Sequence, residues 1–141
     1  MKTYKLTCKI ELKILCELYT IKIAKMKHIQ KHFKGISHAI TFHVGENAEE
    51  NEEIIDVANA DDLWFHGQGF SSCHVIVNVA GLNLDKKQKR QIVTQGAVLC
   101  KQYCKYSYMS DLAIIYTEVK NVQKTNIKGT VVTDKVKVRI V

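Results

Sequence analysis

Six short segments of this chain have the residue pattern of β-strands, in which apolar side chains alternate with polar ones or run together between turn residues. These segments span residues 39–44, 63–66, 73–79, 112–118, 130–133 and 136–141. A two-residue turn at Asp134 and Lys135 is predicted to join the last two as a hairpin, although the glycine usual in such turns is absent.

A longer segment has the period of an amphipathic helix. Its apolar residues recur every three or four positions and form one stripe, made of Ile92, Gly96, Leu99 and Tyr103 and widened by Val93, Ala97, Cys100 and Cys104. This pattern predicts a helix over about residues 85–106, with one buried side and a cationic opposite side. A short helix is also predicted from Glu49 to Asp56, with Asn47 as its N-cap and acidic residues that complement its dipole.

Several strands with one long helix, and no regular alternation of strand and helix, are typical of an α+β domain. We therefore expect a mostly antiparallel sheet, one long amphipathic helix and one short helix within residues 28–141. Residues 1–27 are expected to be an N-terminal extension, and the sequence leaves its structure open. Apolar residues at every second position near its start fit a strand, whereas the spacing of Leu12, Leu15, Tyr19 and Lys22 fits a helix.

The composition is that of one ordinary globular domain, with 141 residues of which 46% are hydrophobic and 25% charged. No apolar run approaches the roughly 20 residues of a membrane-spanning helix, so no membrane span is expected. Charged residues interrupt the apolar ones near the N-terminus, so no secretion signal is expected either. The five cysteines are an odd number with irregular spacing, which favours a reduced, cytoplasmic protein.

The net charge of +7 is distributed unevenly along the chain. Residues 1–45 carry nine Lys and two Glu, residues 46–83 carry eight acids and no Lys or Arg, and residues 84–141 carry twelve Lys or Arg and four acids. This order predicts a polarised surface whose cationic face attracts phosphate backbones by releasing counterions. A lysine-rich solvated surface without a nucleic-acid ligand is the alternative interpretation of the same charges.

A series of short motifs resembles those of the NFACT-R family. The most specific is Asp61-Asp62-Leu63-Trp64-Phe65-His66, which is similar to the family's D-[IL]-W-F-H signature. The others are, in chain order, Gly45-Glu46-Asn47 with Asn51, Ser71-Ser72-Cys73-His74-Val75, Ile115-Tyr116-Thr117, Lys120-Asn121-Val122-Gln123-Lys124 and Gly129. The resemblance covers about residues 28–141, and it is greatest to the short stand-alone branch typified by coiled-coil domain-containing protein twenty-five.

This resemblance implies a function, because NFACT-R domains occur in ribosome-quality-control factors that bind stalled large ribosomal subunits and tRNA. It implies a non-catalytic RNA-binding module without a cofactor, whose ligand is tRNA or ribosomal RNA. DNA binding is left open, and ribosomal proteins are further candidate partners. Peptide-tailing activity belongs to the larger architecture of the family and is not carried over. Glu46 stands where many members carry Arg, and its charge would repel a phosphate at that edge of a site.

A polar pocket is predicted where two histidine-bearing strands would pair, and it would hold a base edge or a ribose. Its expected residues are Asp62, His66, His74, Asn47 and Asn51. In this hypothesis Asp62 orients a histidine. The alternative is a structural network, in which Asp62 caps a turn and a buried histidine bonds to the backbone. Trp64 is expected in the core rather than as a platform for base stacking.

Phosphate contacts are predicted from cations of the long helix and of the segment after Thr117. These are Lys86, Lys87, Lys89, Arg90, Lys101, Lys105, Lys120 and Lys124. We expect them to converge into one patch beside the paired imidazoles and to recognise RNA shape rather than base sequence. A solvated helix face is the alternative for the helical lysines.

The cysteines raise two further possibilities, catalysis and metal binding. Cys73 with His66 could form a nucleophilic pair, but adjacent Cys73 and His74 point to opposite faces of a strand, and no P-loop, GxSxG, HExxH or dinucleotide motif is present. Cys100 and Cys104 share a helix face, yet no CxxC knuckle accompanies them. The cysteines are therefore expected as small buried side chains, and no metal is expected.

The acidic block from Glu46 to Asp62 supports a different class of function, a protein-interaction module that docks a basic partner such as a ribosomal protein. Binding to purified RNA that weakens steeply with salt would favour phosphate contacts, whereas binding only to protein would favour docking.

Overall fold

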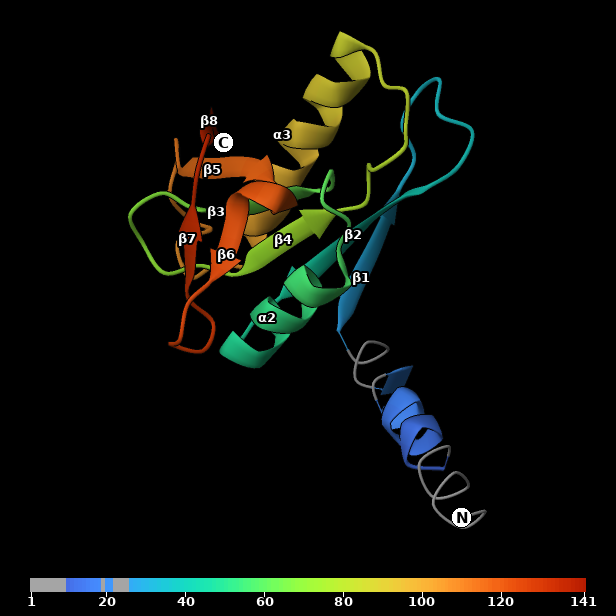
Figure 1. Cartoon of the computed structure of the whole chain (residues 1–141). Helices are drawn as coiled ribbons and strands as arrows, with labels where there is room; N and C mark the ends of the chain where they lie inside the picture. Colours follow the sequence, from blue (N-terminus) through green and yellow to red (C-terminus); the bar gives the residue numbers. More distant parts are fainter. Residues whose placement is uncertain (1–9, 19, 22–25) are drawn as a thin grey trace.

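A six-stranded antiparallel sheet forms the centre of the computed structural model, which describes residues 10–18, 20–21 and 26–141 (Figure 1). Its strands are β1 (Lys27–Lys31), β2 (Ile40–Gly45), β3 (Leu63–Gly67), β4 (His74–Val77), β5 (Ala113–Glu118) and β8 (Lys137–Ile140). They lie in the order β1-β2-β4-β3-β5-β8, and every neighbouring pair is antiparallel. β1 and β8 are therefore the two edges of the sheet.

The remaining elements cover the two faces of this sheet. They are α2 (Ala48–Val57), α3 (Lys86–Gln102), the 3-10 turn η1 (Val119–Asn121), and the strands β6 (Val122–Lys124) and β7 (Val131–Thr133) of a second, two-stranded sheet. Figure 1 shows α3 on one side of the large sheet and α2 with β6 and β7 on the other. The fold is thus a three-layer α+β arrangement, as the sequence predicts.

The long helix α3 begins with a capping box. The Asp85 side chain accepts a hydrogen bond from the Gln88 backbone N–H at 2.7 Å, and the Gln88 side chain accepts one from the Asp85 N–H at 3.0 Å. The helix buries Ile92, Val93, Gly96, Ala97, Leu99 and Cys100 against the sheet. The predicted apolar stripe is confirmed, although the helix ends at Gln102 instead of residue 106.

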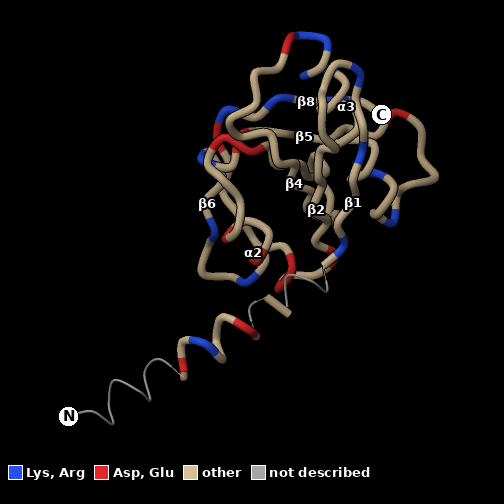
Figure 2. The backbone as a smooth tube through the Cα atoms, turned by 90° about the vertical axis from the view of Figure 1, so that its right-hand side faces the viewer, with Lys and Arg blue, Asp and Glu red and all other residues tan. Residues whose placement is uncertain are grey.

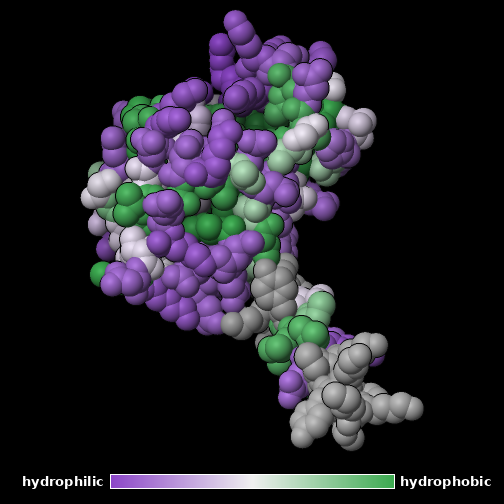
Figure 3. All heavy atoms as spheres, viewed as in Figure 1, coloured by the Kyte–Doolittle hydropathy of each residue, from purple (hydrophilic) through white to green (hydrophobic). Residues whose placement is uncertain are grey.

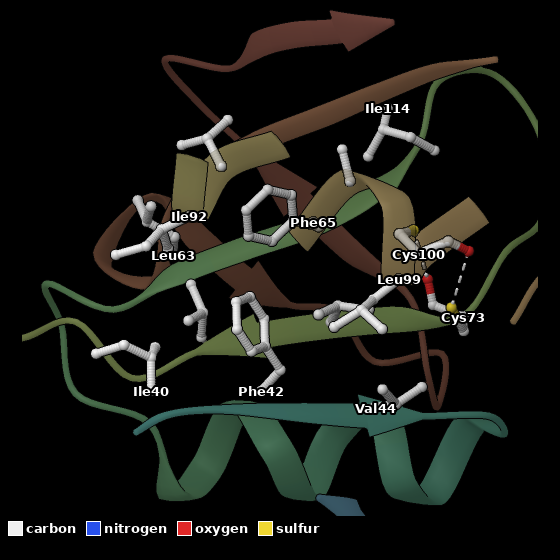
Figure 4. Packing of buried hydrophobic residues seen from close by; sticks show 14 of the residues in the cluster. Ile40, Phe42, Val44, Leu63, Phe65, Cys73, Ile92, Leu99, Cys100 and Ile114 are labelled. Carbon is white, nitrogen blue, oxygen red and sulfur yellow. Dashed lines mark hydrogen bonds between the residues drawn. The ribbon is translucent and has the colours of Figure 1, made fainter. Parts of the chain in front are cut away.

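The core between α3 and the sheet contains the rings of Phe42 and Phe65, both without solvent exposure (Figure 4). Gly96 lets the helix approach one of them closely, because a Cβ atom at this position would lie 2.4 Å from Phe65 Cζ. The sequence places Gly96 within the apolar stripe, and the packing explains why the smallest residue fits there.

The opposite face of the sheet buries a second apolar cluster. Trp64 of β3 and Ile76 of β4 pack there with Ile54 of α2, and Val119 of η1 and Val122 of β6 belong to the same cluster. Trp64 is 1% exposed, so it is a core residue, as expected. This cluster fixes α2 and the small sheet against the large one.

All six predicted strands and both predicted helices are present, with ends that differ by a few residues. The hairpin predicted at Asp134 and Lys135 is wrong, because β7 pairs with β6, whereas β8 pairs with β5 at the edge of the large sheet. The three-residue β6 is too short to show a strand period, so the partner of β7 could not be predicted. β1 was missed as well, because its residues are mostly polar and exposed.

The N-terminal extension is helical at residues 10–18 and 20–21, so of the two alternatives, strand and helix, the helix holds for these residues. The earlier part of the alternating segment lies outside the described residues. Within the part of the chain that the structure describes, no helix has the length and apolar character needed to cross a membrane.

Candidate functional site

Two imidazoles lie together on the face of the sheet that carries α2. His66 is the penultimate residue of β3 and His74 is the first residue of β4, and they lie next to the paired residues Phe65 and Val75. Their ring centroids are 4.9 Å apart with the planes at 85°. The Trp64 ring is parallel to His66 and perpendicular to His74, and its Nε1 donates a hydrogen bond to His74 Nδ1 at 3.2 Å. The predicted proximity of the two histidines is therefore observed.

Hydrogen bonds fix which ring nitrogens carry protons. Because the Trp64 N–H can only donate, His74 Nδ1 is an acceptor, and its neutral ring carries the proton on Nε2. His66 Nδ1 lies 2.7 Å from the carbonyl oxygen of Gly67, which can only accept, so this nitrogen is protonated and Nε2 is the acceptor. Burial lowers the pKa of His74 to about 3 and also lowers the pKa of His66. At neutral pH the pair is uncharged and has one donor and one acceptor.

The two histidines line a pocket of about 620 Å³, which we call the imidazole pocket. Its walls come from the sheet, the N-terminal end of α2, the loop after β3 and the turn between β6 and β7. The lining residues include Glu46, Asn47, Asn51, Trp64, His66, Phe70, Ser71, Ser72, His74, Ile115, Lys128 and Thr130. On the face shown in Figure 3, apolar atoms lie in the hollow above the hydrophilic surface of α2.

Both asparagines predicted for the pocket line it. Asn47 is the N-cap of α2, and its side chain accepts a hydrogen bond from Glu50 N at 2.9 Å. Asn51 is buried and its Oδ1 accepts from His74 N at 3.3 Å, which ties the first turn of α2 to β4. Four of the five predicted pocket residues thus come together, and both asparagines also hold the pocket wall in place.

Asp62 does not line this pocket and does not contact a ring of the imidazole pair. Its Oδ1 accepts hydrogen bonds from the backbone N–H groups of Val79 and Ala80, both at 2.9 Å, and its Oδ2 accepts one from Asn59 N at 2.8 Å. The carboxylate is fully buried. Asp62 therefore follows the structural alternative, because it binds backbone N–H groups of the turn before β3 and of the turn after β4 instead of orienting a histidine.

Cys73 points away from the histidines, into the core beneath α3. Its Sγ donates to the Cys100 carbonyl at 3.3 Å, and hydrogen bonding with the Cys100 thiol together with burial raises the pKa of the Cys73 thiol. A thiol held in its protonated form is a poor nucleophile. Among the described residues, no cluster of three or more His, Cys, Asp or Glu side chains could hold a metal ion.

The predicted cations of α3 lie on the other side of the sheet from the imidazoles. Lys86, Lys87, Lys89 and Arg90 are exposed in its first turns, and none has an ion-pair partner among the described residues. Lys101 lies roughly 16–22 Å further along the helix than these four cations, and its Nζ donates to the Val141 carbonyl oxygen at 3.1 Å. Lys105 lies beyond the helix end, with its Nζ 5.2 Å from the centre of the Tyr106 ring.

The two predicted cations after Thr117 are engaged by carboxylates. Lys120 Nζ lies 3.0 Å from Asp61 and 2.6 Å from Glu118, and Lys124 Nζ bonds to Asp56. The eight cations therefore do not form one patch beside the imidazoles, which corrects that expectation. Acidic residues of the middle third fold back onto the C-terminal segment, as the positions of red and blue segments in Figure 2 illustrate.

Four lysines from different parts of the chain nevertheless line one groove of about 370 Å³, which we call the lysine groove. They are Lys89 of α3, Lys120 of η1, Lys135 before β8 and Lys137 of β8. Glu118 is the acidic residue of its lining, so positive charge is in excess. The groove lies at the Leu63 end of β3, whereas His66 lies near the other end. Lys135 and Lys137 were not predicted, although the alternation along residues 136–141 carries the signal for Lys137.

Comparisons with known proteins match this chain to one family. The NFACT protein RNA binding domain matches residues 30–135. Coiled-coil domain-containing protein 25 of Bos taurus is 33% identical over 98 residues, which cover 63% of this chain and 43% of the relative. The Rqc2 homolog RqcH of Bacillus subtilis is 26% identical over 88 residues, which cover 62% of this chain and 14% of the relative. The matches thus span less than half the length of these relatives.

A solved structure has the same fold. The C-terminal part of the fibronectin/fibrinogen-binding protein from Streptococcus suis superposes with a TM-score of 0.66 at 21% sequence identity. The match covers 82% of this chain and 44% of that chain. At this identity the likeness concerns the fold.

Proposed function

Because the chain belongs to the NFACT protein RNA binding domain family, we propose that it is a non-catalytic module that binds structured RNA through phosphate contacts. The lysine groove and the cationic first turns of α3 are the contact surface. The RNA is a tRNA or a ribosomal RNA, as the family resemblance implies. Recognition depends on RNA shape, since phosphate contacts fix position and affinity without reading bases.

The convergence of Lys89, Lys120, Lys135 and Lys137 on one groove is the observation that carries this proposal. These residues are up to 48 positions apart in the sequence, so only folding assembles them. Only Lys120 of the four has an ion-pair partner among the described residues. The groove therefore keeps an excess positive charge that a phosphate backbone can neutralise.

The N-terminal end of α3 supports the same surface. Its first five residues include Lys86, Lys87, Lys89 and Arg90, and its first turn has no acidic residue. The N-terminal end of a helix already has a partial positive charge, so these cations raise the local potential at a cost to helix stability. The negative charge of a bound phosphate would offset the repulsion among these positive charges. Lys89 also lines the lysine groove, so the two regions are continuous.

The non-catalytic part of the proposal rests on the arrangement of the reactive side chains. The Cys73 thiol faces the α3 core, while His66 and His74 face the other side of the sheet. A raised thiol pKa and the lack of a nearby imidazole leave Cys73 without the activation that a catalytic cysteine needs.

Charge reversal on the two edge strands tests the proposal. Lys137 on β8 and Lys31 on β1 are both exposed strand lysines, but they lie on opposite edges of the sheet. Binding of purified tRNA and of a ribosomal RNA fragment is measured across a salt series for Lys137→Glu, for Lys31→Glu and for the parent chain. We expect Lys137→Glu to weaken binding and reduce the salt slope by about 0.7–0.9, with Lys31→Glu near the parent.

Equal losses in the two variants would mean that binding follows net charge alone, and the lysine groove would then be rejected as the contact surface. No RNA binding by the parent chain, together with capture of a basic ribosomal protein that is lost on reversing Glu49 and Glu53 of α2, would favour the acidic docking alternative instead.

A further inference from the structure

The imidazole pocket takes no part in the phosphate contacts, because it lies on the other face of the sheet from α3 and at the other end of β3 from the lysine groove. We propose that this pocket holds one unpaired nucleobase of the bound RNA. The proposal rests on RNA binding for its ligand, but it concerns different residues and a different kind of recognition.

The pocket has the dimensions and the walls that such a ligand needs. Its volume of about 620 Å³ falls within the roughly 300–1,000 Å³ of small-molecule sites. Trp64 and Ile115 line it from the sheet, and Phe70 and Ser71 line it from the loop that joins β3 to β4. Most of the other lining side chains are polar, and aromatic and apolar groups beside hydrogen-bonding groups are typical of sites that hold a base taken out of a stack.

The histidine pair supplies polar groups suited to a base edge. His74 is 3% exposed, its ring lines the pocket, and among the described residues its Nε2–H has no hydrogen-bond partner. His66 next to it has Nε2 as an acceptor. Every nucleobase has a donor and an acceptor side by side on its Watson–Crick edge, and such edges are read by paired donor and acceptor groups. One donor and one acceptor fit each of the four bases in some orientation, so this pair alone does not select among them.

Charge distinguishes a base from a phosphate as the occupant. Burial lowers the pKa of both histidines, so the rings are neutral at pH 7 and cannot form an ion pair with an anion. Glu46 at the pocket wall forms an ion pair with Lys27 at 3.5 Å, Lys128 is an exposed cation at the pocket rim, and Asn47 and Asn51 add only neutral groups. A backbone phosphate, which carries one negative charge, would be desolvated against the two neutral rings without a charged partner beside them, whereas a neutral base would not need one.

A path for the RNA strand leads from the pocket to the C-terminal end of α3. Phe70 of the pocket wall packs against Tyr106, with ring centroids 5.3 Å apart at 85°. Lys105 Nζ lies 5.2 Å from the centre of the same Tyr106 ring. A strand that leaves the pocket over Phe70 therefore reaches a cation for its next phosphate.

The test compares a short single-stranded RNA with the same RNA made abasic throughout. His66→Phe keeps the ring and removes the acceptor, while Thr130→Trp blocks the pocket from an exposed position of the β6–β7 turn. His38→Phe is the matched control, because His38 lies on the exposed loop between β1 and β2. Affinity for both RNAs is measured by fluorescence anisotropy.

We expect both pocket variants to bind the intact RNA about tenfold more weakly than the parent and to bind the abasic RNA as the parent does. His38→Phe should leave both affinities unchanged. Equal parental affinity for intact and abasic RNA would overturn the proposal, and so would an equal loss on both RNAs in His66→Phe and Thr130→Trp.

A second measurement separates this proposal from the proposed function. The four nucleosides, which carry no phosphate, are titrated into the labelled chain, and the His66 and His74 ring signals are followed by NMR. Shifts of these signals that are absent in Thr130→Trp support the base pocket even if the chain fails to bind RNA. Ring signals that stay unchanged at saturating nucleoside count against it, whatever the result of the charge-reversal experiment.

Discussion

Trp64 Nε1 donates its hydrogen bond to Nδ1 of His74 at 3.2 Å, inside the protein and across two neighbouring strands. The bond satisfies a buried indole N–H and keeps His74 neutral, because a proton on Nδ1 would face another donor. Burial also disfavours the protonated form of the His74 ring and lowers its pKa from 6.5 to about 3. This one contact therefore links the core of the α2 face to the ionisation of the imidazole pocket.

Acid should destabilise the fold through His74. The unfolded chain takes up a proton near pH 6.5, whereas the folded chain resists it until about pH 3, so the unfolded state binds more protons in between. Stability is full above pH 6.5 and falls as pH drops, at up to about 1.4 kcal/mol per pH unit from this group. The pKa of His66 and that of His43 are also lowered, which adds to the trend.

Urea denaturation at a series of pH values measures this effect. His74→Gln keeps an acceptor for Trp64 and removes the titration, so its unfolding free energy should fall less steeply below pH 6.5. A pH dependence in His74→Gln as steep as in the parent would contradict the assignment to His74.

Adding a methyl group at Gly96 should destabilise the chain by about 1–3 kcal/mol. In an exposed helix position Gly96→Ala would stabilise by up to about 1 kcal/mol through helix propensity. Here the new Cβ meets the buried Phe65 ring at 2.4 Å, so overpacking outweighs propensity. Thermal unfolding of Gly96→Ala measures the loss, and Val98→Ala on the exposed side of α3 is the control.

A double variant identifies the cause of that loss. Phe65→Leu makes room between β3 and α3. The loss of unfolding free energy caused by Gly96→Ala should therefore be smaller in the Phe65→Leu background than in the parent. Equal costs in the two backgrounds would mean that Phe65 is not the obstacle.

Neighbouring aspartates should differ sharply in their effect on stability. Asp62 accepts three backbone N–H bonds and is fully buried, whereas Asp61 is exposed and pairs with Lys120. In Asp62→Asn one oxygen becomes an amide N–H that faces a backbone donor, so we expect a loss of about 1–3 kcal/mol. Asp61→Asn should change stability by less than about 1 kcal/mol. Chemical denaturation of the two variants measures the difference, and similar losses would contradict the role of Asp62.

Two lysines of the same groove should contribute unequally to RNA affinity. Lys120 is held by Asp61 and Glu118, and its pKa is raised by those hydrogen bonds, so its charge is already compensated in the free protein. Lys137 has no such ion-pair partner among the described residues. Lys137→Gln should therefore reduce the salt slope of RNA binding by about 0.7–0.9, and Lys120→Gln by less. A larger effect of Lys120→Gln would show that RNA displaces its carboxylate partners.

The α+β class, the strands β2 to β5 and the helix α3 were predictable from the sequence, since each has a clear local period of two or of three to four residues. So was the meeting of His66 and His74, because a short loop between two adjacent strands favours an antiparallel pair. The short strands β1 and β6 were not predictable, because their few, mostly exposed residues have no period and depend on the partner strand for their conformation.

Charge placement depended on the tertiary structure. The sequence marks Lys120 and Lys124 as cations but cannot show that Asp61, Glu118 and Asp56 lie against them, because these contacts link segments distant in the chain. It cannot show that β8 pairs with β5 and brings Lys137 beside Lys89. The sequence alone therefore determined the elements with a clear period and the proximity of His66 and His74, since local periods and short loops decide those. Folding decided which cations stay unpaired and on which face of the sheet each group lies, since long-range packing sets those distances.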